Sequence, residues 1–239
     1  MADGRQEMLS ELAGRVDATA RTLGHPCRVA VDGITGSGKT TMADELAAVL
    51  SAGVLSAGVL SVGRADVHRL SMDGYHHPRA HRHRRGRDSD DGYYEDAYDF
   101  AAFAMQVLVP LGATDKDGAT RSYRPAIIDL ATDRPASGER RAIAPGGVLV
   151  VDGSFLQRPE LAPHWDVVVW VAVPFEVAEA RGVARDADLL GGHDRAQTLF
   201  RTRYHAAGRR YLDEVAPQGG ADVVVDNTDL AAPFLRPVR

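Results

Sequence analysis

Residues 33–40 read Gly-Ile-Thr-Gly-Ser-Gly-Lys-Thr and match the phosphate-binding pattern G-x-x-x-x-G-K-S/T at every fixed position. The backbone N–H groups of such a turn converge on one anion, and its lysine reaches the β- and γ-phosphates. The chain contains only two lysines, and one of them stands at this position. The pattern therefore predicts a nucleoside triphosphate site formed by Gly33, Thr35, Gly36, Ser37, Gly38, Lys39, Thr40 and Thr41. The alternative is a glycine-rich turn in an ordinary α/β domain.

Two carboxylates that follow apolar segments are candidates for metal binding and proton transfer. Asp152 closes the run 148–151, where an acid in a phosphate-loop protein holds Mg²⁺ together with the loop hydroxyl, here Thr40. The alternative is a turn or capping aspartate, since Gly-Ser follows it. Asp73 follows the segment 66–72 and can accept the proton of a substrate hydroxyl. Alone, however, an Asp-Gly pair is usually a turn.

Two arginines stand one helical turn apart in a predicted helix, so their side chains share a face. Arg181 and Arg185 would supply positive charge to a triphosphate and to the phosphoryl group in transfer. A lid carrying them would also exclude water, which competes with the acceptor. The alternative is a solvated helix face whose arginines pair with Glu176, Glu179 and Asp186.

The stretch 76–87 is dense in histidine and arginine and is followed by an acidic run at 88–91. Its spacing fits no usual zinc pattern, and the acidic run opposes nucleic-acid binding. We therefore interpret it as a charge-compensated surface loop, in which His76 and His77 follow Asp73 closely enough to touch substrate. A short repeat at 51–63, Ser-Ala-Gly-Val-Leu, is interpreted as a lengthened connection without a function.

Apolar runs and helical periodicity alternate along the chain. Strands are predicted near 28–32, 66–72, 147–152, 167–173 and 222–226, with short strands near Tyr123 and Ile127–Ile128, and helices near 5–23, 41–50, 97–109, 174–186 and 194–214. This order predicts an α/β fold, a doubly wound, parallel five-stranded sheet with flanking helices, whose ligands gather at the carboxyl ends of the strands. We expect one domain over 1–239, with substrate-side insertions at 76–95 and 112–146 and a lid with its following helix at 181–211.

Charge, cysteine content and hydropathy limit the classes of protein to which this chain can belong. The 239 residues carry a net charge of -5, which gives no reason to expect a nucleic-acid partner. A single cysteine excludes an intrachain disulfide, and the strongest apolar run, 167–173, is far too short to span a bilayer. The N-terminal segment lacks an apolar signal core. We therefore expect a cytoplasmic protein without membrane partners, and the oligomeric state stays open, a homo-oligomer included.

Over about residues 28–227 the chain resembles the uridine kinase and phosphoribulokinase group of P-loop kinases, which share a nucleoside monophosphate kinase-like fold. The resemblance rests on the phosphate loop and on the order of further segments: Asp73-Gly74-Tyr75, Asp96-Ala97-Tyr98-Asp99, Asp152-Gly153, Arg181 to Arg185-Asp186, Arg203-Tyr204 to Arg210-Tyr211, and Ala221-Asp222-Val223.

This resemblance implies ATP or GTP as the phosphate donor, Mg²⁺, and a small-molecule acceptor with a hydroxyl group. It implies that Asp73 is the catalytic base and that Lys39 and Arg185 stabilise charge. It also implies a nucleotide contact from Arg181. At the acceptor it implies a site formed by Asp73, Tyr75, His76, Tyr98, Arg134 and Arg185.

Two departures concern the acceptor and the lid. In uridine kinases a Pro-x-Tyr-Asp-x-x-x-x-His segment holds the base, whereas this chain has Ile128 for the aromatic residue and Asp133 for the histidine. The usual arginine after the lid Arg-Asp pair is replaced by Gly191-Gly192-His193.

The acceptor is thus a nucleoside or related metabolite, or alternatively a non-nucleoside such as a sugar or a pantothenate-like compound. The alternative from another class, a regulatory ATPase or switch, requires neither Asp73 nor paired lid arginines. No guanine-specificity Asn-Lys-x-Asp motif accompanies Lys116.

Overall fold

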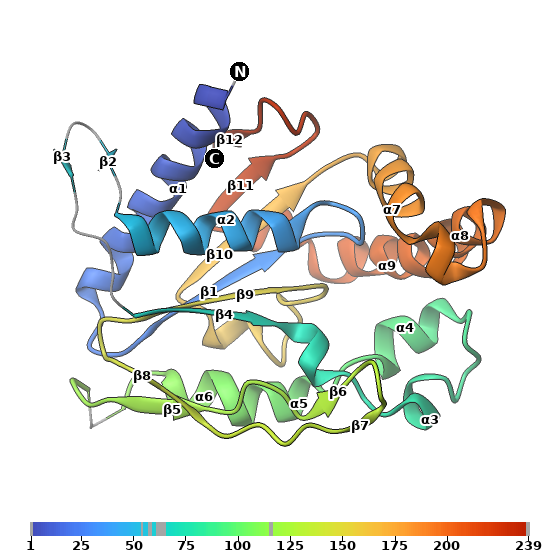
Figure 1. Cartoon of the computed structure of the whole chain (residues 1–239), viewed down its shortest axis with the longest axis horizontal. Coiled ribbons are helices and arrows are strands. Elements are labelled where there is room, and N and C mark those ends of the chain that lie inside the picture. Colours follow the sequence, from blue (N-terminus) through green and yellow to red (C-terminus); the bar gives the residue numbers. More distant parts are fainter. Residues whose placement is uncertain (1, 54, 57–58, 61–65, 115–116, 238–239) are drawn as a thin grey trace.

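The computed structural model describes residues 2–53, 55–56, 59–60, 66–114 and 117–237. Its central sheet has the strand order β12 (Phe234–Arg236), β11 (Val223–Asp226), β10 (Val167–Ala172), β1 (Cys27–Asp32), β9 (Val148–Gly153) and β4 (Val67–Ser71). The five strands from β11 to β4 run parallel, as the sequence predicted (Figure 1). A sixth strand, β12, pairs antiparallel with β11. Its three residues are too few to give a periodic signal in the sequence.

Helices cover both faces of this sheet. Every residue of β1, β9 and β10 is buried, which explains their nearly continuous valine runs. Because successive side chains of a strand point to opposite faces, Val29 and Val31 pack with α1 (Ala2–Thr22) and α2 (Lys39–Ala52). Ala30 packs in a separate core on the other face. The doubly wound α/β fold is therefore confirmed.

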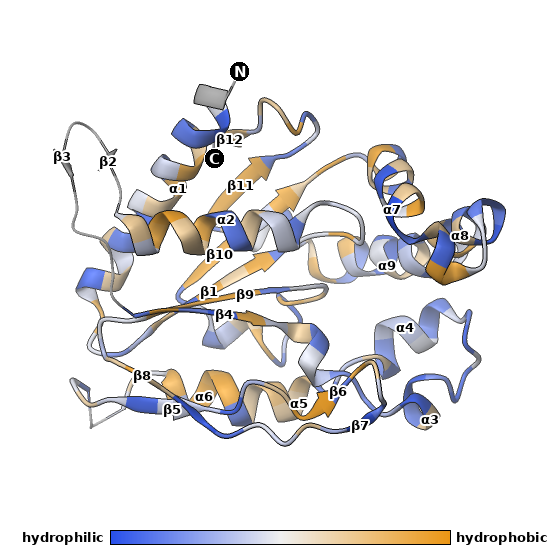
Figure 2. Cartoon of the chain, in the orientation of Figure 1, coloured by the Kyte–Doolittle hydropathy of each residue, from blue (hydrophilic) through white to orange (hydrophobic). Residues whose placement is uncertain are grey.

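The second core is built from short helical segments and from the long helix near the C-terminus. These segments are α4 (Asp90–Asp96), α5 (Phe100–Phe103), the π-helix η2 (Ala104–Leu108), α6 (Val109–Leu111) and α9 (His205–Val215). The short helix α10 (Pro217–Gly220) follows α9. The predicted helix over 97–109 is thus divided, because a π-helix interrupts it. Hydrophobic residues concentrate in the central strands, whereas α3 (Arg79–Arg82) and the loop after it are hydrophilic (Figure 2).

The remaining elements lie at the edges of the fold. At the carboxyl end of β10, the chain continues into α7 (Phe175–Leu190), α8 (His193–Leu199) and the π-helix η4 (Phe200–Tyr204) (Figure 1). Small antiparallel pairs join β2 (Leu55–Ser56) to β3 (Val59–Leu60), β5 (Arg121–Tyr123) to β8 (Arg141–Ile143), and β6 (Ile128–Asp129) to β7 (Arg134–Pro135). The 3₁₀ turns are η1 (Met72–Tyr75) and η3 (Ala162–His164).

Some of the sequence expectations concern residues outside the described part of the chain, and one predicted strand ends earlier than expected. The interpretation of the repeat at 51–63 falls largely outside the described residues, as does Lys116. The strand predicted over 66–72 ends at Ser71, so Asp73 lies in the turn η1 that follows it. In the part of the chain that the structure describes, no helix has the length and apolarity needed to cross a bilayer.

Candidate active site

The phosphate loop connects the buried strand β1 to the first residue of α2. Gly36 and Gly38 have φ angles of 89° and 91°, in the left-handed region that favours glycine. A Cβ atom on Gly36 would collide with the carbonyl oxygen of Ala178 in α7, so this position also requires glycine for space. Ser37 N donates to Ile34 O at 3.1 Å and closes the turn. The loop is therefore held in one conformation by its own sequence and by α7.

Lys39 lies beneath this turn at the start of α2. Its Nζ donates to the carbonyl oxygen of Ile34 at 3.0 Å, and the residue is only 9% exposed. Burial lowers the pKa of Lys39, and the negative charges of Asp32, Asp152 and Asp73 oppose this shift. An ammonium group has three N–H donors, so one hydrogen bond leaves donors for a phosphate.

Asp32 anchors the loop from below. This fully buried carboxylate accepts hydrogen bonds from Tyr211 Oη at 2.6 Å, Gln157 Nε2 at 3.2 Å and Gly33 N at 2.8 Å. Burial raises the pKa of Asp32, and these hydrogen bonds counteract the shift. The group ties the end of β1 to α9, which lies almost 180 residues further along the chain.

Thr40 and Asp152 form the candidate magnesium site. Thr40 Oγ1 donates to Asp152 Oδ2 at 2.5 Å, and Asp152 is 4% exposed. Because the Thr40 hydroxyl donates a hydrogen bond to the carboxylate, both lone pairs of Thr40 Oγ1 stay available to a metal ion. Mg²⁺ prefers oxygen ligands and is usually bound by one or two carboxylates together with waters and phosphates. The two side chains fit this ion.

Arg69 is a site residue that the sequence analysis missed. From β4, its Nη2 donates to Asp152 Oδ1 at 2.8 Å, while its Nε donates to Asp44 Oδ1 at 2.8 Å. The guanidinium thus fixes the orientation of Asp152 and leaves Oδ2 facing Thr40. No spacing rule links residues 69 and 152, which meet because β4 and β9 are adjacent strands.

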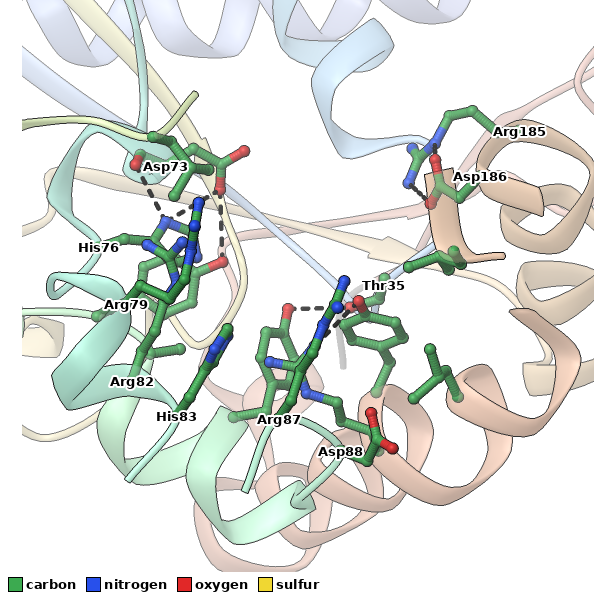
Figure 3. A pocket seen from close by; sticks show the side chains of 18 residues that line it. Thr35, Asp73, His76, Arg79, Arg82, His83, Arg87, Asp88, Arg185 and Asp186 are labelled. Carbon is green, nitrogen blue, oxygen red and sulfur yellow. Dashed lines mark hydrogen bonds and ion pairs between the residues drawn. The ribbon is translucent and has the colours of Figure 1, made fainter. Parts of the chain in front are cut away.

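Asp73 lies in a cavity of about 620 Å³ beside the phosphate loop (Figure 3). Its side chain is 61% exposed, and Tyr98 Oη lies 3.5 Å from its Oδ1. The His76 ring packs on Tyr98 with centroids 4.2 Å apart, and its Nδ1 is 3.0 Å from Asp73 O. Burial lowers the pKa of His76, although the Asp73 charge opposes this shift. A solvent-facing carboxylate can accept a proton from a bound hydroxyl.

A second cavity of about 390 Å³ is lined by Gly36 and Gly38 of the loop together with Thr41 and Arg181. Arg185 lines both this cavity and the one that holds Asp73. The arrangement brings together the phosphate loop, Asp73 and α7, the helix that carries the two arginines predicted to belong to a lid.

The two arginines predicted for the lid, Arg181 and Arg185, are both bound to other groups of the same chain. Arg181 donates to the carbonyl oxygens of Asn227 at 2.9 Å and Thr228 at 2.8 Å. Arg185 forms a bidentate pair with Asp186, with both N···O distances 2.8 Å. The Asp186 pairing is thus present, whereas Glu179 pairs with Arg201 instead, and Glu176 pairs with neither arginine among the described residues.

Two predicted acceptor residues do not line the Asp73 cavity. Tyr75 is fully buried and its hydroxyl donates to Arg124 O at 2.6 Å. Arg134 lies exposed in β7. The two residues that depart from the uridine kinase pattern have other contacts. Ile128 is buried in β6, and Asp133 accepts a hydrogen bond from Arg79 N at 2.9 Å.

The expectation that 76–87 is a charge-compensated surface loop holds only in part. Arg82 pairs with Asp133, and Arg84 and Arg85 pair with Asp96. Five of its basic side chains line the Asp73 cavity (Figure 3), namely His76, Arg79, Arg82, His83 and Arg87. The acidic run does not neutralise them, because Asp88 pairs with Arg195 at 2.6 Å and Asp91 with Arg210 at 3.1 Å. The only signal in the sequence was the density of basic residues soon after Asp73.

No protein-family model matches the sequence, and neither does any curated protein. Solved structures do match. A possible uridine kinase from Bacillus stearothermophilus is 25% identical over 92% of this chain and 100% of that one, with a TM-score of 0.57. A candidate fructose transport system kinase from Silicibacter sp. TM1040 is 26% identical over 86% of this chain and 94% of that one, with a TM-score of 0.64.

A more distant match shows the fold alone. It is YFH7 from Saccharomyces cerevisiae, described as a P-loop kinase candidate with a circular permutation, which is 14% identical over 87% of this chain and 95% of that one, with a TM-score of 0.61. The likenesses to the Bacillus and Silicibacter structures confirm the resemblance to the uridine kinase and phosphoribulokinase-like P-loop kinases that the sequence motifs predicted.

Proposed function

We propose that the protein is an ATP-dependent kinase that transfers the γ-phosphoryl group to a hydroxyl of a small molecule. The observation that carries the proposal is the position of Arg185, which lines both the cavity beside Gly36 and Gly38 and the cavity of Asp73. A phosphoryl group passing between donor and acceptor needs positive charge at this boundary. A base on the acceptor side completes the arrangement, and Asp73 supplies it.

Each proposed role follows from the place of the side chain. The loop N–H groups and Lys39 bind the phosphates, while Asp73 accepts the proton of the attacking hydroxyl. Arg185 exchanges its contact with Asp186 for one with the transferring group. Thr40 and Asp152 would hold Mg²⁺, whose charge offsets that of the phosphates.

A non-nucleoside acceptor is favoured within this class. Ile128 is buried and offers no stacking surface to a base, while Asp133 is engaged by the Arg79 main chain and by the Arg82 guanidinium at 3.3 Å. A uridine-type base would therefore lose both of its usual partners. The Silicibacter neighbour is described as a fructose transport system kinase, which is consistent with a sugar-type acceptor.

The test is a phosphorylation assay with labelled ATP or GTP, Mg²⁺ and a panel of nucleosides, sugars and hydroxy acids. We expect label to appear on an acceptor with the wild-type protein and not with Lys39→Ala, which loses its phosphate contact. Phosphate release without any labelled acceptor would instead support the regulatory ATPase alternative.

A further inference from the structure

The acceptor cavity has an excess of positive side chains. Five arginines and three aspartates line it, namely Arg79, Arg82, Arg87, Arg185 and Arg203 with Asp73, Asp88 and Asp186. Two of the aspartates are engaged in ion pairs, Asp186 with Arg185 and Asp88 with Arg195, which lies outside the lining. Asp73 is the proposed base. Arg82 pairs with Asp133, which lies outside the lining, at 3.3 Å. The charges of the remaining three arginines, Arg79, Arg87 and Arg203, are therefore not neutralised by the carboxylates of the cavity.

Three of these arginines have no carboxylate partner among the described residues. The exposed guanidinium groups of Arg79 and Arg87 form no hydrogen bond or ion pair within the described part of the chain. Arg203 lies over the rings of Tyr93 and Tyr204, at 5.0 and 4.9 Å from their centroids. Its Nη1 donates to Tyr204 Oη at 3.0 Å, and its Nε is buried without a partner in the same described part.

The positive charges share one cavity with His83. Its pKa is lowered first by burial and then by Arg82, Arg203, Arg87 and Arg79. Four guanidinium groups from α3, η4 and the loop after α3 therefore line the same cavity as this imidazole and are close enough to disfavour its protonation. Figure 3 shows Arg79, Arg82 and Arg87 on the same side as His83, with Arg185 and Asp186 on the other.

We propose that the acceptor carries an anionic group, a phosphate monoester or a carboxylate, which Arg79, Arg87 and Arg203 bind while its hydroxyl faces Asp73. This inference rests on the proposed kinase function. Guanidinium groups form short, charge-assisted and often bidentate hydrogen bonds with both kinds of anion. A neutral nucleoside or sugar would leave these charges without a counterion.

The competing explanation is that these arginines hold the γ-phosphate of the donor. They do not line the second cavity, where Gly36, Gly38 and Arg181 lie. They lie instead with Asp73 and His76. The two explanations predict opposite effects on the KM values for acceptor and donor.

The first experiment compares neutral and anionic acceptors in matched pairs: D-ribose with ribose 5-phosphate, D-fructose with fructose 6-phosphate, glycerol with D-glycerate, and uridine with uridine monophosphate. We expect phosphorylation of an anionic member at a kcat/KM at least about tenfold above its neutral partner, which corresponds to one charge-assisted contact. The phosphate and carboxylate members show which anion is preferred. Transfer to neutral members alone would overturn the inference and leave the kinase function intact. Absence of transfer to every member, with ATP hydrolysed, would refute both.

The second experiment uses Arg87→Gln and Arg79→Gln, which change exposed side chains and should not disturb folding. We expect each to raise the KM for the anionic acceptor about tenfold and to leave the KM for ATP unchanged. Arg15→Gln, an exposed arginine of α1 that pairs with Glu11, is the matched control. A rise in the KM for ATP instead would assign these arginines to the donor and overturn the inference.

Discussion

Replacing Asp73 by asparagine separates proton transfer from binding, because the two side chains have nearly the same size. The Asp73 side chain is 61% exposed, so we expect the free energy of unfolding to change by less than about 0.5 kcal/mol. The amide oxygen can still accept from Tyr98 Oη. The His76 contact is made with the main-chain oxygen and is untouched.

The magnitude follows from the role of the carboxylate. An asparagine amide cannot take the proton of the attacking hydroxyl, and loss of a positioned general base lowers kcat about 10²- to 10⁴-fold. This corresponds to about 3 to 5 kcal/mol of transition-state free energy. Asp73 lies outside the second cavity, and its exposed charge acts on Lys39 through solvent, which screens it. The KM for ATP should therefore stay within about twofold of the wild-type value.

The assay measures kcat and both KM values for phosphoryl transfer at saturating Mg²⁺, with Asp213→Asn, an exposed change on α9, as the control. Retention of more than about a tenth of kcat by Asp73→Asn would refute its role as general base. A loss confined to the KM for ATP would show instead that the carboxylate serves the donor.

Three further predictions concern the supports of the site. Arg69→Gln removes the group that orients Asp152, so the Mg²⁺ concentration for half-maximal activity should rise about tenfold, and an unchanged Mg²⁺ titration would contradict this. Tyr211→Phe deprives the buried Asp32 carboxylate of its shortest hydrogen bond and should cost about 1 to 3 kcal/mol of unfolding free energy in urea titrations; an unaltered midpoint would count against it. Burial lowers the pKa of His205, so the unfolded chain takes up the proton first and the free energy of unfolding should fall as the pH drops below about 6.5. In His205→Asn, the unfolding free energy should depend less steeply on pH, by at most about 1.4 kcal/mol per pH unit. An identical slope in the variant and the wild type would exclude His205 as the source of this pH dependence.

The acceptor side shows where inference from the sequence was weakest. Tyr75 was expected in the substrate pocket, but its hydroxyl is bound to a main-chain carbonyl in the core. Conversely, the basic stretch after Asp73 was interpreted as a charge-compensated surface loop, although three of its arginines, Arg79, Arg82 and Arg87, line the cavity. Composition alone cannot distinguish the two cases, because a charged side chain in a solvent-filled site and one on an outer surface are both hydrated.

The sequence by itself determined the phosphate loop and the order of strands and helices. These features depend on local patterns: the glycines and lysine of a single turn, valine runs, and apolar residues at helical spacing. The parallel sheet then followed, and with it the expectation that Asp73 and Asp152 meet at one edge.

Only the tertiary structure decided which distant groups touch. Arg69 meets Asp152 across 83 positions of sequence, and Asp32 meets Tyr211 across 179. Such contacts arise when strands become neighbours and when α9 packs against the sheet, and no local spacing encodes them. The positive charge around Asp73 is likewise a property of the assembled cavity, since α3 and η4 bring their arginines together from distant parts of the chain.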